Sequence, residues 1–511
     1  MSHPRLSPTL VMSEAFQQRT DIVVPTPAML SLPEKVLQFG TGGFLRGFCD
    51  YFIDEANRSG DFAGRVVMVG STGSERTQLL NDQGGLYTLR IQGLDAGEIV
   101  EQYHVVGSVS RVLAAATDWT EVMMFATSPD LELIISNTTE VGVVYTEEPM
   151  PDPDIAPASF PAKLTAVLAA RALVYNFDPA RGVVVLPCEL IDKNGEALEQ
   201  IVRQLAADWK MDQRFFDWLD NGVRFCNTLV DRIVPGAPSP ADLDDIEARL
   251  RFEDAMLTTA EVYRLWPIET DSATQEKLTF ANADASIVLT DDVHPYKERK
   301  VRILNGAHTA SVHLAFLAGE KTVLSMMRNP LTYGFVQGVM DKEIVPSLDV
   351  DGGGPFARQV VERFSNPFLR HRLLDITLQS TSKWRLRLLP SLLSYIEKNG
   401  ELPKHICFGF AAYLIFMRVT SEKDGAYFGE RAGKPYPIRD DQAGYFAAMW
   451  ESVDSQNKTY VEVLVSGVCS KEECWGQNLN KVKGFVEVVS GYVLDILSMG
   501  AERALQKFAS A

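Results

Sequence analysis

Three side chains that could together act on an alcohol lie close to one another in residues 296–310, which read YKERKVRILNGAHTA. They are Lys300, Asn305 and His308. If the segment is helical, successive residues turn by about 100°, so the three project within an arc of about 140° and span about 12 Å. One side of the segment could therefore face one elongated substrate.

These residue types suit the oxidation of a secondary alcohol and the reverse reduction. The hydroxyl proton needs a base, and a lysine whose pKa is lowered by burial and by neighbouring cations can be that base near neutral pH. An amide and an imidazole can hydrogen-bond the oxygen as its charge develops, while hydride moves between the carbon and a nicotinamide. Such a site requires no metal. The alternative is a solvated basic face with two polar residues satisfied in the interior.

A glycine-rich turn near residue 40 is the candidate for binding the nicotinamide cofactor. Residues 35–60 begin as an apolar strand, pass through the turn and continue as an amphipathic helix. Exposed N–H groups at such a helix start can bind a pyrophosphate. The expected cofactor-binding residues here are Gln38, Phe39, Gly40, Thr41, Gly42, Gly43, Phe44, Leu45 and Arg46. Because Leu45 replaces the third glycine of GxGxxG, the motif is incomplete, and a plain glycine-rich turn is the alternative.

A second polar group follows the apolar run LELIISN at residues 131–137. We expect it to lie at the carboxyl edge of a sheet, where ligands of open α/β folds bind. Its cofactor-binding candidates are Ser136, Asn137 and Thr138, although turn and N-cap chemistry would favour the same residue types. The run at residues 65–70 ends without an acid for the ribose hydroxyls, so this rule leaves NAD versus NADP open.

The elements that must position these residues alternate between strands and helices in the first part of the chain. Uninterrupted apolar runs at 65–70, 131–137, 182–187 and 285–292 predict buried parallel strands, with a helix over 162–175. This pattern predicts an α/β fold with a Rossmann-type doubly wound sheet. After residue 293, long helical periodicities predict a mainly α-helical domain that contains a Gly- and Pro-rich loop at 424–441. We therefore expect an N-terminal arm (1–30), a nucleotide-binding domain (31–292) and a helical substrate domain (293–511).

Composition excludes several classes of protein. Hydrophobic residues make up 46% and charged residues 23%, as in ordinary folded proteins. The formal charge of -18 would repel nucleic acids and anionic membranes, so the expected partner is a small molecule. Neither the six cysteines nor the seven histidines complete a metal motif, and we expect reduced thiols, no metal and a cytoplasmic location. No secretory signal or membrane span is expected, and the protein would be a monomer or a small homo-oligomer.

Several segments together resemble the polyol-specific long-chain dehydrogenase/reductase family, which includes mannitol dehydrogenase. They are LQFGTGGFLRGF, GGLYTLR, IISNTTEVG, LPCELIDKNG, NTLVDRIVP and YKERKVRILNGAHTA. The resemblance runs from about residue 33 to near the C-terminus. It is closer to the branch of that family that interconverts tagaturonate and altronate. It implies a metal-independent, NAD-dependent reductase with a Rossmann-type domain and a helical domain.

The resemblance also implies roles for single residues. Lys300 matches the family's catalytic lysine, and Asn305 and His308 match its assisting pair. Asp231 and Lys383 match substrate-side positions, and Asn194 is a further substrate-binding candidate near the end of a predicted element. Where mannitol-type enzymes have an asparagine and an arginine, this chain has Leu190 and Asp375, which argues against mannitol.

The expected activity is the NAD-dependent interconversion of D-tagaturonate and D-altronate, and three alternatives stay open. One is a sister activity on fructuronate/mannonate or a mannitol-type polyol. Another is a sugar-acid epimerase that retains NAD, and the third is a nucleotide-binding module without catalysis. A uronate carboxylate would need an arginine or lysine. The unranked candidates are Lys297, Arg299, Arg372, Lys383, Arg385 and Arg387.

Overall fold

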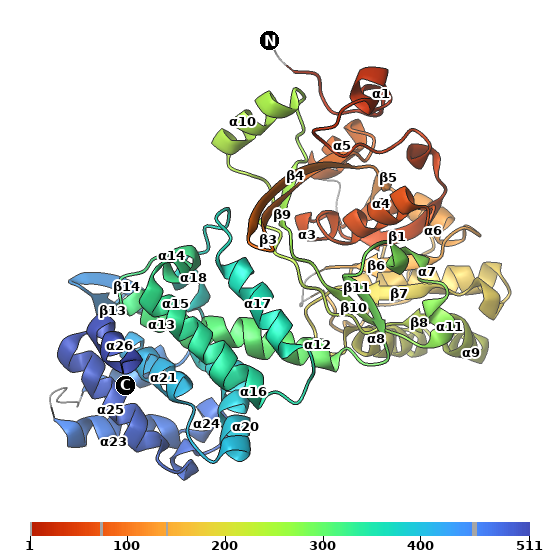
Figure 1. Cartoon of the computed structure of the whole chain (residues 1–511). Coiled ribbons are helices and arrows are strands. Elements are labelled where there is room, and N and C mark those ends of the chain that lie inside the picture. Colours follow the sequence, from red (N-terminus) through yellow and green to blue (C-terminus); the bar gives the residue numbers. More distant parts are fainter. Residues whose placement is uncertain (1–2, 72–74, 139–141, 452–456, 511) are drawn as a thin grey trace. The chain divides into compact units, whose positions relative to one another are not determined.

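The computed structural model describes residues 3–71, 75–138, 142–451 and 457–510 (Figure 1). The chain divides into two compact units, Met1–Val293 and His294–Ala511. Each unit has its own core and is described by itself below.

Unit 1 is built on a six-stranded parallel sheet. Its strand order is β5-β2-β1-β6-β7-β8. The strands are β1 (Glu34–Phe39), β2 (Arg65–Gly70), β5 (Val109–Ala114), β6 (Leu133–Ser136), β7 (Val184–Pro187) and β8 (Arg224–Phe225). This is the doubly wound Rossmann order, in which successive strands are added first on one side of β1 and then, from β6 on, on the other, so the predicted α/β fold is confirmed.

Alternate residues of the central strands enter two separate cores, one on each face of the sheet. In β1, Val36 packs into the core that contains α4 (Cys49–Ser59), while Leu37 packs into the core that contains α7 (Phe160–Val174) and α8 (Asn194–Asp208). Both faces are therefore covered, which explains why these strands read as continuous apolar runs. The other helices of unit 1 are α5 (Glu75–Asp82), α6 (Trp119–Ala126), η2 (Pro179–Arg181), α9 (Gln213–Gly222), α10 (Pro240–Leu250), α11 (Ser272–Gln275) and η3 (Thr279–Ala283).

Two predictions for unit 1 were wrong in detail. The helix expected after the glycine-rich turn is broken into α3 (Gly43–Arg46) and α4. The break falls at Gly47, where a Cβ would lie 2.9 Å from the Val234 side chain, so a close approach from a distant segment fixes it. The strand expected at 285–292 is β11 (Ile287–Thr290), which pairs with β10 (Trp266–Glu269) instead of closing the main sheet.

Residues 3–30, expected to form an N-terminal arm, pack as part of unit 1. They form α1 (Pro8–Val11), α2 (Glu14–Gln17) and η1 (Met29–Ser31) as part of unit 1. Leu6, Val11 and Phe16 are buried in a small core with Phe252, because apolar residues recur through the segment. Beside it lies a second sheet of order β4-β3-β9, made of β3 (Tyr87–Asp95), β4 (Glu98–Val106) and β9 (Thr258–Glu261).

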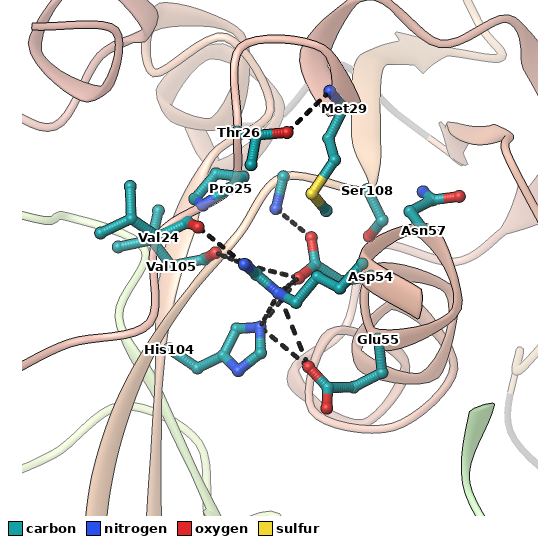
Figure 2. A network of polar contacts seen from close by, with 12 residues as sticks. Val24, Pro25, Thr26, Met29, Asp54, Glu55, Asn57, His104, Val105 and Ser108 are labelled. Carbon is teal, nitrogen blue, oxygen red and sulfur yellow. Dashed lines mark hydrogen bonds and ion pairs between the residues drawn. The ribbon is translucent and has the colours of Figure 1, made fainter. Parts of the chain in front are cut away.

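A buried ionic network joins this N-terminal segment to α4 (Figure 2). Asp54 Oδ2 lies 2.8 Å from Arg58 Nη2 and 2.8 Å from His104 Nε2, and Asp54 Oδ1 accepts from the Gly107 N–H at 2.7 Å. Arg58 also donates to the Val24 carbonyl at 2.6 Å. Burial by itself would raise the pKa of Asp54, but the hydrogen bond with His104 and the charge of Arg58 outweigh it and lower the pKa.

Unit 2 is mainly helical, as predicted, and is centred on two helices that are buried nearly all round. These are α13 (Gly306–Leu317) and α21 (Lys404–Phe416), which contact each other, and α21 also contacts α25 (Phe485–Met499). The other helices are α12 (His294–Arg299), η4 (Lys300–Asn305), α14 (Val323–Arg328), α15 (Pro330–Gln337), η5 (Gly338–Ile344), α16 (Val345–Ser347), α17 (Gly353–Phe364), α18 (Leu373–Ile376), α19 (Ser380–Lys383), η6 (Trp384–Leu388), α20 (Leu389–Asn399), α22 (Ala443–Glu451), α23 (Lys458–Ser470), α24 (Glu472–Trp475), η7 (Leu479–Lys481) and α26 (Ala501–Ala509). Within the described ranges, every helix is too short or too polar to cross a bilayer.

The segment expected to be a loop at 424–441 contains a small antiparallel sheet. Its strands are β12 (Ser421–Lys423), β13 (Ala426–Arg431) and β14 (Lys434–Ile438). Two-residue turns join them, Asp424-Gly425 with φ of 51° and 75° and Ala432-Gly433 with φ of 50° and 75°. Positive φ at both central residues is the hairpin turn that matches strand twist, so the glycines mark hairpins.

Candidate active site

Unit 1 contains a pocket of about 450 Å³ at the carboxyl ends of β1, β2 and β6. This is the point of the sheet where the strand order reverses, the usual place for a dinucleotide in a doubly wound fold. Its lining includes Phe39, Gly40, Thr41, Gly42, Gly70, Ser71, Arg76, Asn137, Thr138, Ser159, Phe160 and Lys163. Six of the expected cofactor residues, those at 39–42 and 137–138, therefore line one hollow.

The turn at Gly40 depends on glycine. Gly40 has a φ of +126°, and a Cβ there would lie 3.0 Å from the Asn137 carbonyl oxygen and 3.0 Å from Leu45 Cδ1. At Gly42, by contrast, no atom lies within 4 Å of a Cβ position, so that backbone is open. A tight turn followed by open backbone beside a pocket fits the pyrophosphate of a dinucleotide.

Glu189 holds the end of β6, after which Asn137 and Thr138 line the same pocket. Its buried carboxylate accepts hydrogen bonds from Ser136 Oγ at 3.1 Å and from the Thr138 N–H at 2.9 Å. Burial raises the pKa of Glu189 although these bonds lower it. Asn137 Nδ2 donates to the Cys188 carbonyl at 2.7 Å. Sequence reasoning missed Glu189, whose role shows only once β6 and β7 are paired.

The remaining candidates of the turn do not line the pocket, and two of them, Gln38 and Arg46, make buried hydrogen bonds instead. Gln38 is buried and donates to the Gly40 carbonyl at 3.2 Å and to Asp50 Oδ2 at 3.3 Å. Burial raises the pKa of Asp50 to about 8. Arg46 is buried, donates to the Met256 carbonyl and lies 5.2 Å from the Tyr87 ring centroid. Gly43, Phe44, Leu45 and Ser136 are likewise absent from the pocket lining.

Five polar pocket residues were not predicted to bind cofactor: Ser71, Arg76, Thr146, Ser159 and Lys163. Ser71 follows β2 directly, in the place where many NAD-binding sheets carry an acid. Lys163 donates to the Ala158 carbonyl at 2.7 Å, and burial lowers its pKa. Lys163 lies in α7, far along the chain from the glycine-rich turn, so no sequence motif connects the two.

The two substrate candidates of unit 1 are buried. Asn194 Nδ2 donates to the Pro187 carbonyl at 2.8 Å and its Oδ1 accepts from the Thr228 N–H at 2.8 Å, which ties the end of β7 to the segment after β8. The backbone of Asp231 exchanges two hydrogen bonds of 3.0 Å with Leu265. The bonds of Asn194 favour a structural role.

In unit 2, Lys300 opens a π-helical segment. The helical periodicity expected here is formed by η4 (Lys300–Asn305), a π-helix, followed by α13. The wide turns of π-helices, with i→i+5 bonding, occur frequently at functional sites. Lys300 and Asn305, at the two ends of the segment, are both partly buried.

His308 lies in the first turn of α13 and is buried. Its ring stacks on Phe364 with centroids 3.9 Å apart, and the His371 ring meets it edge-on at 5.6 Å. In the part of the chain that the structure describes, His308 Nε2 has no hydrogen-bond partner. Burial, assisted by the electrostatic influence of His371, Arg387, Arg363 and Lys383, lowers the pKa of His308 well below its ordinary value. The imidazole is therefore neutral at neutral pH.

Lys383, the last residue of α19, is one of the groups whose charge lowers the pKa of His308. Its Nζ donates to the Ile376 carbonyl at 2.8 Å. Burial and the neighbouring charge of Arg387 lower the pKa of Lys383 to about 8. Unit 2 thus brings the predicted residues Lys383 and His308 into one electrostatic environment.

Comparison with protein families identifies both units. The Mannitol dehydrogenase Rossmann domain matches residues 34–281, and the Mannitol dehydrogenase C-terminal domain matches residues 292–497. The altronate oxidoreductase of Bacillus subtilis (strain 168) is 38% identical over 93% of this chain and 95% of its own length. That of Klebsiella pneumoniae (strain 342) is 39% identical over 93% and 96%.

Solved structures show the same fold. Mannitol 2-dehydrogenase of Pseudomonas fluorescens, in a ternary complex with NAD and D-mannitol, matches with a TM-score of 0.67 at 21% identity and covers 98% of this chain and 99% of that one. A substrate-free D-sorbitol dehydrogenase matches with a TM-score of 0.77 at 20% identity over 97% and 99%. The resemblance seen in the motifs is confirmed, and the chain belongs to the mannitol dehydrogenase family of oxidoreductases, in its altronate oxidoreductase branch.

Proposed function

We propose that the protein is a cytoplasmic, NAD-dependent oxidoreductase that interconverts D-tagaturonate and D-altronate in hexuronate breakdown. The observation that carries the proposal is the grouping in unit 2. The segment from Lys300 to Asn305 leads directly into a buried, neutral His308 whose Nε2 has no partner among the described residues. The names of the relatives supply the substrate.

Unit 1 would hold the cofactor. The open backbone at Gly42, after the tight turn at Gly40, would receive the phosphates, and Asn137 and Thr138 would bond the ribose or nicotinamide. The bound nicotinamide supplies or accepts the hydride.

Unit 2 would handle the proton and the oxygen. In the reducing direction, the ammonium of Lys300 gives its proton to the carbonyl oxygen of the substrate. Asn305 and the neutral His308 donate hydrogen bonds to the same oxygen as negative charge develops on it. Because Lys300 would supply the proton and Asn305 and His308 would stabilise the charge on the oxygen, the proposed step needs no metal.

The test is to follow oxidation of NADH and NADPH by the purified protein with tagaturonate, fructuronate and fructose side by side. We expect turnover of tagaturonate with NADH. Preference for fructuronate or fructose would move the specificity to a sister activity. Product formed without a net change in nicotinamide absorbance would indicate an epimerase instead. Cofactor binding without turnover would indicate a binding module.

Lys300→Ala sharpens the same test. It is expected to lower kcat about 100- to 10,000-fold, which is what proton transfer by a positioned side chain contributes, while NADH binding changes little. Lys297→Ala, three residues earlier, is the matched control and should keep most activity. Wild-type turnover in Lys300→Ala would refute the assignment of Lys300.

A further inference from the structure

The site in unit 2 has more positive than negative charge near His308. Within the described residues, neither Lys383 nor Arg387 forms an ion pair, because no carboxylate oxygen lies within 4.0 Å of either. The nearby acids are engaged elsewhere. Asp440 accepts from the Thr381 N–H at 2.8 Å and from Thr381 Oγ1 at 2.9 Å, and Asp375 lies 3.4 Å from Arg439.

Arg387 is held against the helix that carries His308. It lies in η6 (Trp384–Leu388), another π-helical segment, which contacts both α13 and η4. Its Nη1 donates a long hydrogen bond of 3.4 Å to Oγ1 of Thr309, the residue after His308. This contact holds the guanidinium against the helical turn that carries His308, whose buried Nε2 has no hydrogen-bond partner among the described residues, and it leaves the other N–H groups of Arg387 without a described hydrogen bond.

Two other arginines of unit 2 donate to backbone carbonyls away from the helix of His308. Arg385, two residues earlier in the same segment, is exposed and reaches the Glu473 carbonyl at 3.5 Å. Arg299 donates to the Asp351 carbonyl at 2.9 Å and lies 4.6 Å from the Tyr296 ring centroid. Arg387 is therefore the partly buried arginine whose only described hydrogen bond leads to the helix of His308.

We propose that Arg387 binds the carboxylate of the substrate, with Lys383 beside it as a second positive charge, and so sets the preference for a sugar acid over a neutral ketose. This inference rests on the proposed function. A planar guanidinium fork matches both oxygens of a carboxylate, and such paired, charge-assisted bonds are stronger than neutral ones. A carboxylate at this position would supply the negative charge that the cluster lacks.

The experiment compares kcat/KM for tagaturonate with that for tagatose, the neutral ketose that carries a hydroxymethyl group in place of the carboxylate. Wild type, Arg387→Ala, Arg387→Lys and the control Arg385→Ala are measured with saturating NADH. Arg387→Ala is expected to lower kcat/KM for tagaturonate about 100-fold, mainly through KM, and to leave tagatose within about threefold of wild type. Arg387→Lys should be intermediate, and Arg385→Ala should match wild type on both substrates.

The outcomes separate this inference from the function on which it rests. An equal loss on both substrates in Arg387→Ala would show that Arg387 supports the fold, and would overturn the inference. If Arg387→Ala does not fold, Arg387→Lys decides, because a substrate-selective rise in KM supports the role and an equal loss refutes it. A wild-type enzyme inactive on tagaturonate would instead refute the proposed function.

Discussion

Two charged clusters, one in each unit, are built in opposite ways. Around Asp54 in unit 1, a fully buried carboxylate is matched by Arg58, His104 and the Gly107 N–H. Around His308 in unit 2, the charges of Lys383 and Arg387 act on a buried imidazole, with no carboxylate paired to either among the described residues. The first cluster is complete as it stands, and the second lacks an anion.

The difference separates a cluster that stabilises the fold from a cluster that is suited to bind a ligand. Burying a charge is costly unless it is paired, so a complete network such as that of Asp54 belongs to the folded framework. Asp54, Glu55 and His104 bring possible ligand atoms within 4.8 Å of one another, but the guanidinium of Arg58 already supplies the positive charge there. An incomplete cluster raises the energy of the free protein, and a ligand of opposite charge can relieve it.

The largest expected effect comes from breaking the complete cluster. Asp54→Ala should lower the free energy of unfolding by about 3–5 kcal/mol, because it removes the buried acceptor that Arg58, His104 and the Gly107 N–H share. Urea denaturation of the full chain measures the loss. Asp54→Asn, which keeps the shape, should lose less.

The pH dependence of this effect has a definite sign. Because the fold lowers the pKa of Asp54 from its ordinary 3.8, its contribution is present above pH about 4 and is lost as the pH falls through the lower, folded value. The difference between wild type and Asp54→Ala should therefore shrink in acid. A difference that stays constant down to pH 2 would contradict the ionic explanation.

A smaller effect should follow from completing the second cluster artificially. Thr309→Asp places a carboxylate next to Arg387, whose Nη1 lies 3.4 Å from Thr309 Oγ1. If Arg387 binds the substrate carboxylate, the new side chain competes with it, and kcat/KM for tagaturonate should fall about 10- to 100-fold. Thr309→Asn is the control of equal size without the charge. Equal losses in the two variants would attribute the effect to packing.

The smallest expected effect is a change of KM with pH. The pKa of Lys383 is about 8, so the lysine is charged below this pH and becomes neutral above it. KM for tagaturonate should then rise up to about tenfold between pH 7 and pH 9.5, as one positive charge beside the carboxylate is lost. Lys383→Arg keeps its charge throughout this range and should flatten the profile. If KM of Lys383→Arg rises with pH as steeply as KM of the wild type, Lys383 is not the titrating group.

The sequence predicted most accurately those elements that depend on the pattern of neighbouring residues. The run at 65–70 is β2 from end to end, since every residue of Arg65–Gly70 is buried between two covered faces. The glycine-rich turn and the polar ends of β1 and β6 were placed correctly, because parallel strands align their carboxyl ends. The hairpin at Asp424-Gly425 had a recognisable turn signal that was interpreted only as a loop.

What sequence could not predict depends on distant neighbours. The break at Gly47 is set by Val234, which lies far along the chain. The role of Glu189 requires β6 and β7 to be adjacent. The π-helical segments also left no periodic signal, because one extra residue in a turn disturbs a helical pattern only locally.

The π-helical segment from Lys300 to Asn305 also makes the site sensitive to residue count. A residue removed from a helix rotates everything after it by about 100°, whereas a substitution leaves the directions unchanged. Deleting one residue between Lys300 and Asn305 would therefore change the direction of His308 relative to Lys300 by about 100° and leave both residue types in place. We expect single-residue insertions and deletions in this segment to lower activity more than most point mutations do.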